Sequence, residues 1–343
     1  MNRRFAISAL AVLAWTGSCT FPTAEPSKPQ RPPERLLVAI GPDLGLAFDL
    51  QARFSGLKRH DPGPNKWEIL GWPQMPTNHV TASRDGKWIY ASTDQGVFVS
   101  RDAGKSFWLT GGIEVHDVQR VCLDPRNPAR AFAATARGVF QAPDITAAGN
   151  PWQPFKATPA FSFCHQVQVD ARHRDKIWAA TDRGVFIADT AQLDFRRSGP
   201  YLRVRRLLQQ PANPALLWAA TDGDGVWSTT DHGATWSRLP GSPDTCSALA
   251  LDPVDPAVLY CGGTGGVWIS RDGGASWRVA NDGLRSDLQV LDIVFDPDEP
   301  RTVHIGTTHG LYSSTSGLLW TRFALESPLV KSVCYAPVPN LPA

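Results

Sequence analysis

The chain has 343 residues, of which 29 are glycine and 29 are proline, and because both residues disfavour helix interiors this composition excludes a protein built mostly of long helices. A hydrophobic content of 42%, with 13 tryptophans and 15 phenylalanines, excludes a disordered chain and favours many short strands joined by tight turns. The 34 basic and 32 acidic side chains leave a formal net charge of +2, which does not fit the strongly basic surface of a dedicated nucleic-acid-binding protein.

The first residues predict an export signal. Arg3 and Arg4 form a basic start, and the apolar run that follows is too short to span a bilayer as a stable helix. The run ends in small residues and Cys19, as in the signals of bacterial lipoproteins. We therefore expect residues 1–19 to be a signal peptide and Cys19 to be lipidated, with simple cleavage nearby as the alternative. The expected location is the periplasm or cell surface, with membrane contact only through this anchor.

Residues 20–35 are proline-rich and polar, which is typical of an extended tether. Beyond the tether a sequence motif recurs. It consists of a predicted strand of small or apolar residues, then a turn, and then a glycine followed by two apolar residues. The recurring glycines are Gly45, Gly96, Gly138, Gly184, Gly225, Gly266 and Gly310. Their spacings of 51, 42, 46, 41, 41 and 44 residues are typical of four-stranded propeller blades. The sequence thus predicts an all-β fold, with one seven-bladed propeller of antiparallel blades over residues 36–340.

The two ends of the repeat region predict how the ring closes. The segment LLVAIG near the start has the character of a second blade strand, and only the tether precedes it. The segment at 330–337 has the character of an innermost strand, and no blade follows it. Pairing 330–337 with the first blade leaves no open sheet edge, so we expect one blade to be made from both ends of the chain.

Three short segments between the third and outer strands share the pattern Ser/Thr-x-Asp-x-Gly-x-Ser/Thr-aromatic. In such a hairpin the aspartate can accept backbone N–H groups, the glycine can adopt a positive φ, and the aromatic residue can pack inward. We therefore expect a structural role for this motif, so that its substitution costs stability. Its residues are Asp102, Gly104, Asp231, Gly233, Trp236, Asp272, Gly274 and Trp277.

These three segments and the recurring motif resemble the BNR/Asp-box repeat superfamily. The nearest resemblance is to seven-bladed propellers of the photosystem II stability/assembly-factor type, and sortilin-type propellers and xyloglucan-cleaving glycosidases are similar. In that superfamily the Asp-box is a hairpin on the blade periphery, far from any reaction centre. The resemblance covers almost the whole mature chain, but it is carried by residues that build blades, so it implies the fold more strongly than the function.

Polar residues at the second-to-third-strand corners and at the starts of the innermost strands are expected to form a rim of mixed charge. The alternative interpretation is that they are ordinary solvated loop residues. The candidate binding residues are Asp94, His116, Arg137, His165, Arg183, Arg203, Arg205 and His309.

A glycosidase would need two carboxylates about 5–9.5 Å apart on either side of a sugar. Asp94, Asp182, Asp222 and Asp224 could supply such a pair, but the sequence selects none. The xyloglucan-cleaving enzymes that the chain resembles place their cleft between two propellers, whereas this chain has the length for one. The eight histidines and six cysteines show no HxxxH, HExxH or CxxC spacing, so we expect neither a metal nor another cofactor.

The cysteines are expected to be free thiols. By the predicted strand register, Cys122 and Cys334 are two blades apart, and so are Cys164 and Cys246. Because a disulfide needs Cα atoms within about 7 Å, neither pair should be bonded. An intramolecular disulfide would contradict this register.

The blades use the whole mature chain, and the rim lacks a recognisable catalytic set. The sequence therefore favours a non-catalytic propeller of the cell envelope that binds or scaffolds another protein, as an assembly factor does. The expected partner is another envelope protein or complex, the expected state is a monomer, and no nucleic acid is expected. The alternative is a glycoside hydrolase or a glycan-binding propeller that uses the acidic residues of the rim.

Overall fold

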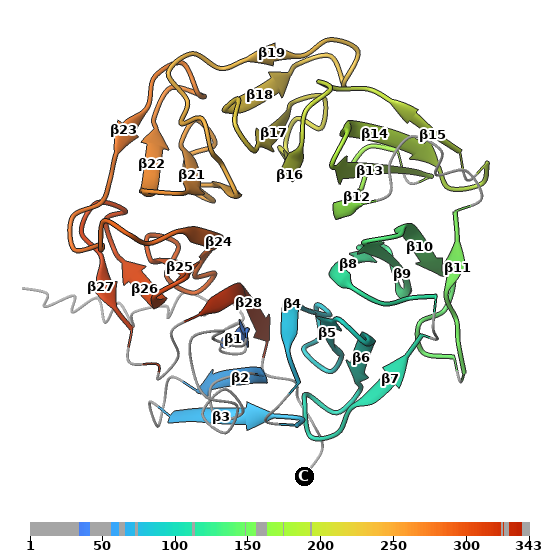
Figure 1. Ribbon diagram of the computed structural model, residues 1–343. Coiled ribbons are helices and arrows are strands. Elements are labelled where there is room, and N and C mark those ends of the chain that lie inside the picture. Colours follow the sequence, from blue (N-terminus) through green and yellow to red (C-terminus); the bar gives the residue numbers. More distant parts are fainter. Residues whose placement is uncertain are drawn as a thin grey trace, which may run out of the picture. The chain divides into compact units, whose positions relative to one another are not determined.

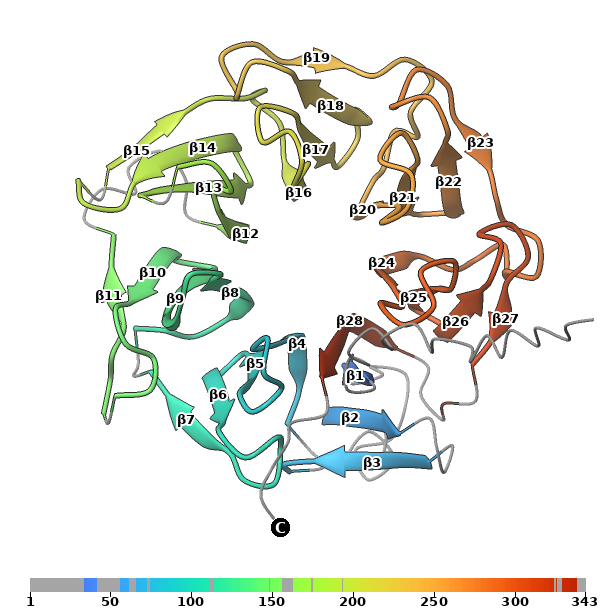
Figure 2. The same cartoon turned by 180° about the vertical axis from the view of Figure 1, so that it is seen from behind.

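The computed structural model describes residues 34–41, 56–61, 66–72, 75–111, 114–147, 149–155, 163–173, 175–192, 194–323, 325 and 329–337. In this part of the chain, 28 strands form seven four-stranded antiparallel sheets, which are the blades of a ring (Figures 1 and 2). These residues include no helix that is long and apolar enough to cross a bilayer. The predicted signal peptide, with Cys19, lies outside the described residues. So does most of the predicted tether, although β1 begins at Glu34, two residues before the expected boundary.

Each blade runs from an innermost strand at the centre of the ring to an outer strand at its periphery (Figure 1). The innermost strands are β28 (Val330–Pro337), β4 (Thr77–Ala82), β8 (Val118–Asp124), β12 (Cys164–Val169), β16 (Val204–Gln209), β20 (Ala248–Leu251) and β24 (Val290–Phe295). The second strands are β1 (Glu34–Ile40), β5 (Ile89–Thr93), β9 (Asn127–Thr135), β13 (Lys176–Thr181), β17 (Leu217–Thr221), β21 (Leu259–Gly263) and β25 (Val303–Thr307).

In most blades the outermost strand is short and exposed, whereas the third strand is largely buried. The third strands are β2 (Gly56–Asp61), β6 (Gly96–Ser100), β10 (Gly138–Ala142), β14 (Gly184–Asp189), β18 (Val226–Thr229), β22 (Gly266–Ser270) and β26 (Gly310–Ser314). The outer strands are β3 (Lys66–Leu70), β7 (Trp108–Thr110), β11 (Gln153–Pro154), β15 (Asp194–Arg197), β19 (Ser237–Arg238), β23 (Arg278–Val279) and β27 (Thr321–Arg322).

The second and third strands are continuous apolar runs because neighbouring blades cover both of their faces. All five residues of β17 are buried, for example, and so are all five of β6. The apolar clusters lie between adjacent blades, where Trp178 of β13 packs with Val204 and Leu207 of β16. Burial on both faces explains why these strands lack the alternation of apolar and polar residues seen in half-exposed strands.

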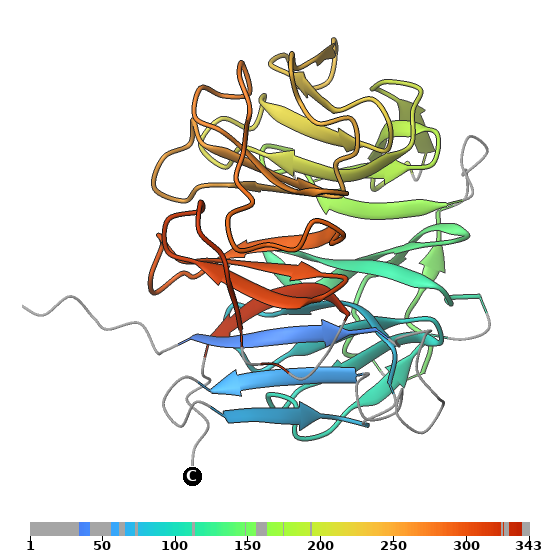
Figure 3. The ribbon, with the colours of Figure 1, turned by 60° about the vertical axis from the view of Figure 1, so that its left-hand side comes forward.

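The predicted ring closure is confirmed. The strand β28 pairs antiparallel with β1, with Glu34 opposite Pro337 and Ile40 opposite Val330. The resulting sheet has the order β28-β1-β2-β3, and Figure 3 shows β1, β2 and β3 of this blade lying side by side. The blade therefore joins both ends of the repeat region and closes the ring without an open edge.

The recurring glycine of the first blade is not the one that the sequence predicted. Gly45 lies outside the described residues, and the third strand begins at Gly56, which pairs with Ile40 and has a φ of 118°. This matches Gly96, which pairs with Thr93 and has a φ of 140°. A longer corner in the first blade explains the irregular first spacing.

The three Asp-box hairpins have nearly identical hydrogen bonds. The Asp272 carboxylate accepts the backbone N–H of Ser276 at 2.8 Å and its hydroxyl at 2.6 Å, while the hydroxyl of Ser270 donates to the same carboxylate at 2.8 Å. The other two hairpins repeat this pattern around Asp102 and Asp231. The carboxylates are therefore held inside their own turns, where they stabilise the hairpins.

The Asp272 hairpin is expected to lose its contribution to stability in acid. Hydrogen bonds from the hydroxyl and backbone N–H of Ser276 lower the pKa of Asp272 to about 2, below about 3.9 in an unfolded chain. A depressed carboxylate pKa stabilises the folded state above pH ~4, and this contribution is lost as the pH falls towards 2. The difference in unfolding free energy between the wild type and Asp272→Asn, measured by urea titration, should shrink from pH 6 to pH 2.5. A difference that is the same at both pH values would contradict this role.

The glycine of the Asp-box lies against the preceding blade. A Cβ on Gly233, which has a φ of +81°, would come within 2.5 Å of Ser198 Oγ and 2.6 Å of Trp178 Cη2. Gly273 has a φ of +71°, but nothing lies within 4 Å of its Cβ position. Both alanine variants share the cost of a positive φ, about 1 kcal/mol, and Gly233→Ala adds about 1–3 kcal/mol of overpacking. In thermal unfolding, the melting temperature of Gly233→Ala should therefore be lower than that of Gly273→Ala. Equal melting temperatures would disprove the close contact.

The expectation that all the cysteines are free is wrong for one pair. The structure joins Cys246 to Cys261, whose Cα atoms are 6.0 Å apart. Cys246 precedes β20 and Cys261 lies on the neighbouring strand β21 of the same blade, where it is opposite Leu249, so the disulfide, against our expectation, leaves the predicted register intact. The sequence reasoning compared only cysteines two blades apart and missed this pair. Cys122 and Cys164 are free thiols, and burial raises the pKa of the Cys122 thiol to about 11. Cys334 has no disulfide, and its thiol donates to the carbonyl of Tyr335.

Candidate functional site

The two ends of the blades form two different faces. At one end the innermost strands turn into the second strands, and we name this the turn face. At the other end the second strands turn into the third strands, beside the starts of the innermost strands, and we name this the corner face. The register of β4 against β5 illustrates the arrangement, because Ala82 and Ile89 are opposite each other at the turn face while Thr77 and Thr93 are opposite each other at the corner face. The predicted rim residues belong to the corner face.

Asp94 is the first residue of the corner after β5, and its carboxylate is exposed. It accepts a hydrogen bond of 2.8 Å from the side-chain amide of Asn78, whose oxygen in turn accepts one of 2.8 Å from Lys331. Burial lowers the pKa of Lys331, and the nearby Asp94 charge partly offsets this. Asp94 therefore belongs to a polar chain that links the first and second blades, but it has no arginine partner among the described residues.

A cavity of about 380 Å³ lies beside Asp94. Trp72 is 54% exposed there, and its ring meets that of Phe98 edge-on, with centroids 5.4 Å apart. An exposed tryptophan beside a carboxylate suits a sugar ring, because the apolar face of a sugar packs on an aromatic ring while its hydroxyl groups donate to the carboxylate. The sequence reasoning missed Trp72, whose only signal was its place in a loop just before a strand start at the rim. The lining residues are Trp72, Met75, Pro76, Thr93, Asp94, Gln95 and Phe98.

Arg203 and Arg205 both bind Asp222, at 3.3 Å and 2.8 Å from its Oδ2 atom. Partial burial opposes ionisation of Asp222, but the hydrogen bonds and charges of the two arginines outweigh it and lower its pKa. Arg203 and Arg205, two of the candidate binding residues, therefore form a three-residue ion cluster with Asp222. Its aspartate is held as a carboxylate and is unsuited to donating a proton.

Asp182 and His165 lie in the neighbouring blade. The Oδ1 atom of Asp182 is buried and has no hydrogen-bond partner among the described residues, whereas its backbone N–H donates to the carbonyl of Phe163. Burial, together with the charges of Arg205 and Arg203, lowers the pKa of His165 to about 3, so its ring is neutral at neutral pH. A buried carboxyl oxygen without a partner is costly, and a substrate hydroxyl could satisfy it by donating a hydrogen bond.

The remaining predicted residues are divided among separate sectors of the corner face. His116 lies 3.1 Å from the Asp117 carboxylate, and His309 lies 3.5 Å from that of Asp287. Asp224 accepts a hydrogen bond from Trp227 Nε1 and pairs with Arg238 at 3.2 Å. Arg137 and Arg183 are exposed at their corners, and within the described chain no residue pairs with their guanidinium groups.

Among the described residues, no group of three or more histidine, cysteine, aspartate or glutamate side chains is placed to hold a metal ion. The four candidate carboxylates fall into two kinds. Asp222 and Asp224 are paired with arginines, whereas Asp94 and Asp182 are not. Asp94 and Asp182 are therefore the carboxylates available for acid–base chemistry on a ligand at the corner face.

Comparison with known proteins gives two curated relatives. The chain is 27% identical over 287 residues to a protein named xyloglucanase from a Paenibacillus species, a match that covers 79% of this chain and 23% of the relative. It is 28% identical over 81 residues to a probable oligoxyloglucan-reducing end-specific xyloglucanase from Neosartorya fischeri, covering 21% of this chain and 10% of the relative. The chain thus spans about a quarter or less of the length of these proteins. No model of a known protein family matches it.

Solved structures share the fold. The GH74 enzyme of Niastella koreensis has a TM-score of 0.64 at 13% identity, covering 87% of this chain and 54% of its own. The GH74 xyloglucanase of Xanthomonas campestris has a TM-score of 0.63 at 16% identity, covering 82% and 51%. A structure of YCF48 bound to D1 peptide has a TM-score of 0.55 at 18% identity, covering 73% and 83%. At these identities the likeness shows the propeller fold alone.

The relatives correct the functional expectation. A sequence match to a xyloglucanase over most of the chain contradicts the interpretation as a non-catalytic scaffold and favours the carbohydrate-active alternative. The absence of a recognised catalytic motif misled the sequence reasoning. A glycosidase needs only two carboxylates at a suitable separation, and these can come from corners far apart in the chain without any local signature.

Proposed function

We propose that the chain is a carbohydrate-active propeller that cleaves glycosidic bonds of a xyloglucan-class polysaccharide at its corner face. The observation that carries this proposal is the 27% identity over 287 residues to a protein named xyloglucanase. The cavity with Trp72 beside Asp94 supports it, because it combines an aromatic platform with a carboxylate, the two groups that commonly hold a sugar.

The proposed chemistry uses the two carboxylates that lack arginine partners. Asp182, with its buried and unpaired oxygen, is the proposed general acid, which gives a proton to the glycosidic oxygen as the bond from that oxygen to the anomeric carbon breaks. Asp94 is exposed and accepts the proton of a water molecule that attacks the anomeric carbon. The proton given by Asp182 and the proton taken up by Asp94 balance. Each cleaved glycosidic bond consumes one water molecule and leaves one new hydroxyl group on each of the two products.

The ion cluster lies in the blade next to that of Asp182 and has a supporting role in the proposal. Asp222 stays ionised because Arg203 and Arg205 hold it, so it contributes no proton. The side chains of Arg203 and Arg205 are 54% and 39% exposed, and their guanidinium groups can also donate to sugar hydroxyls. The cluster thereby orients the substrate beside Asp182.

Asp94→Asn and Asp182→Asn are each expected to lower the release of reducing ends from xyloglucan by about 10²–10⁴-fold, because general acid–base catalysis contributes that much. The assay uses the mature chain, and circular dichroism confirms that each variant folds. The matched control is Asp244→Asn, which removes an exposed aspartate of the same face that pairs only with Arg238 at 3.2 Å.

The assay also separates cleavage from binding. If both variants keep full activity, the assignment of the two residues is wrong. If the wild type releases no product but is retarded in gels that contain xyloglucan, the chain binds this glycan without cleaving it. If the wild type neither cleaves nor binds xyloglucan, the proposed function is wrong.

A further inference from the structure

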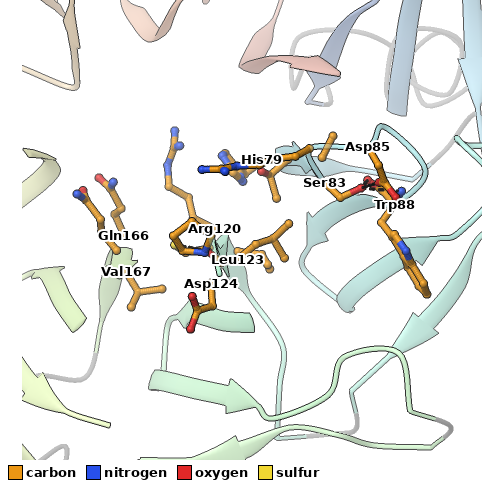
Figure 4. Close-up of a pocket in the computed structure, with 16 residues that line it drawn as sticks. His79, Ser83, Asp85, Trp88, Arg120, Leu123, Asp124, Gln166 and Val167 are labelled. Carbon is orange, nitrogen blue, oxygen red and sulfur yellow. Dashed lines mark hydrogen bonds between the residues drawn. The ribbon is translucent and has the colours of Figure 1, made fainter. Parts of the chain in front are cut away.

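A larger cavity opens at the turn face and extends along the innermost strands to His79, Arg120 and Gln166, near the corner-face starts of these strands. Its volume is about 530 Å³, within the range of cavities that hold small molecules. Three neighbouring innermost strands line it, namely β4, β8 and β12, together with the turn that follows β4. Figure 4 shows Arg120 between Gln166 on one side and His79 on the other. We name it the turn-face cavity.

The acidic side chains of the turn-face cavity already have partners. Asp85 accepts the hydroxyl of Ser83 at 2.5 Å and the backbone N–H of Lys87 at 3.1 Å. Asp124 accepts the backbone N–H of Arg126 at 3.0 Å and lies 3.8 Å from Arg130. Both carboxylates therefore stabilise local turns, and neither needs a ligand.

The basic side chain at the inner end of the cavity shares its carboxylate partner with a second arginine. The side chain of Arg120 is only 18% exposed and pairs with Asp292 at 3.6 Å. Arg206 binds the same carboxylate directly. Two guanidinium groups thus face one carboxylate, which leaves one positive charge in excess, and no described residue accepts a hydrogen bond from the Arg120 guanidinium.

His79 adds a second unsatisfied atom. Its Nδ1 is buried and has no hydrogen-bond partner among the described residues. Burial, together with the charge of Arg206, lowers the pKa of His79 to about 3, so the ring is neutral at neutral pH and does not repel the nearby guanidinium groups. A neutral ring can donate one hydrogen bond to an acceptor beside Arg120.

The rest of the wall is largely apolar. Val121 and Leu123 of β8 and Val167 of β12 line the cavity, with the half-buried ring of Trp88 from the turn after β4. A ligand that satisfies this site therefore needs an anionic oxygen at one end and an apolar body at the other. Arg84 also lines the cavity but is exposed, so Arg120 is the mostly buried guanidinium that faces a bound anion. The two aspartates in the lining disfavour a second negative charge on the ligand.

We propose that the turn-face cavity binds a small monocarboxylate with an apolar body, whose carboxylate pairs with Arg120 and whose hydrocarbon part packs on Val121, Leu123 and Val167. The mouth of the site lies at the other end of β4 from Asp94, whereas Arg120 and His79 lie near the corner-face starts of their strands. The proposal does not depend on the proposed hydrolysis. It holds a ligand by the same pairing of guanidinium and carboxylate that the protein uses at Arg205 and Asp222.

Calorimetric titration of the mature chain tests this assignment with three probes of equal chain length, namely hexanoate, 1-hexanol and hexylammonium. Hexanoate is expected to bind at least tenfold more tightly than either of the others, because only it carries a negative charge to balance the excess of Arg120 and Arg206 over the single Asp292 carboxylate. Equal affinity for hexanol and hexanoate, or no measurable binding of hexanoate at millimolar concentration, would overturn the proposal. Tighter binding of inorganic phosphate than of hexanoate would overturn the choice of a carboxylate.

Two variants locate the site. Arg120→Gln is expected to weaken hexanoate binding at least tenfold, whereas Arg271→Gln, which removes an exposed arginine of another blade, should leave it unchanged. Unchanged binding to Arg120→Gln would also overturn the assignment. The comparison of the three probes on the wild type does not depend on whether the variant folds, and polysaccharide cleavage reports separately on the corner face.

Discussion

Ending the chain at Ser327 is expected to abolish the cooperative unfolding of the propeller. This removes β28, the innermost strand of the first blade, and exposes the edge of β1 over its whole paired length. Val330, Val333 and Ala336 are buried in that strand, and each buried valine contributes about 1.5–3 kcal/mol. A domain has only about 5–15 kcal/mol of stability in total, so this loss and the open ring together should leave no folded population.

A chain that ends at Pro337 is the control, because it keeps all of β28. Its urea or thermal transition should match that of the full chain. Size-exclusion chromatography with circular dichroism distinguishes the outcomes for the shorter chain. If the chain that ends at Ser327 is a stable monomer with a cooperative transition, the closing strand does not hold the ring together.

Asp292→Asn is expected to cost about 3–5 kcal/mol of unfolding free energy, because it leaves the buried guanidinium of Arg206 without a counter-charge. The two side chains are 7% and 10% exposed, and they bridge β16 and β24 at the centre of the ring. The other carboxylate oxygen of Asp292 accepts the backbone N–H of Val333 at 3.0 Å. One carboxylate thus links three innermost strands, and asparagine keeps an acceptor for Val333 while removing the charge.

Guanidinium titration measures this loss against a matched control. Asp287→Asn removes an exposed carboxylate that pairs with Arg285 at 2.9 Å, and exposed pairs contribute less than about 1 kcal/mol. The double variant Arg206→Met/Asp292→Leu should be more stable than Asp292→Asn, since apolar replacement removes both charges together. If Asp292→Asn unfolds within about 0.5 kcal/mol of the wild type, the central ion pair does not stabilise the ring.

Most of the fold could be predicted because most blades repeat the same short sequence motifs at their turns and hairpins. The glycines at positions such as Gly96 and Gly184 begin third strands, and the Asp-box residues close the next hairpin. The exception was the first blade, where the longer corner moved the strand start to Gly56. A repeat predicts the typical unit well, and it fails where one unit carries an insertion.

Less of the candidate site could be predicted. The sequence placed Asp94 and Asp182 on one rim, but only the structure showed that Asp222 is held by two arginines and that the other two carboxylates are not. It gave no indication of the aromatic platform at Trp72 or of the Asp292 carboxylate shared by Arg120 and Arg206. The Asp222 cluster depends on contacts across one pair of strands, and the other features depend on contacts between different blades. No local sequence pattern exists for either kind of contact.

The sequence by itself determined the number of blades, the strand order within them and the closing role of 330–337, because these follow from short-range turn chemistry and burial repeated about every 43 residues. Only the tertiary structure decided which polar groups meet. Arg206 and Asp292 are 86 residues apart in the chain, and Asn78 and Lys331 are 253 apart, yet each pair is in contact. Closing the ring brings such residues together, and their charge and burial then separate the groups that stabilise the fold from those left free to bind a ligand.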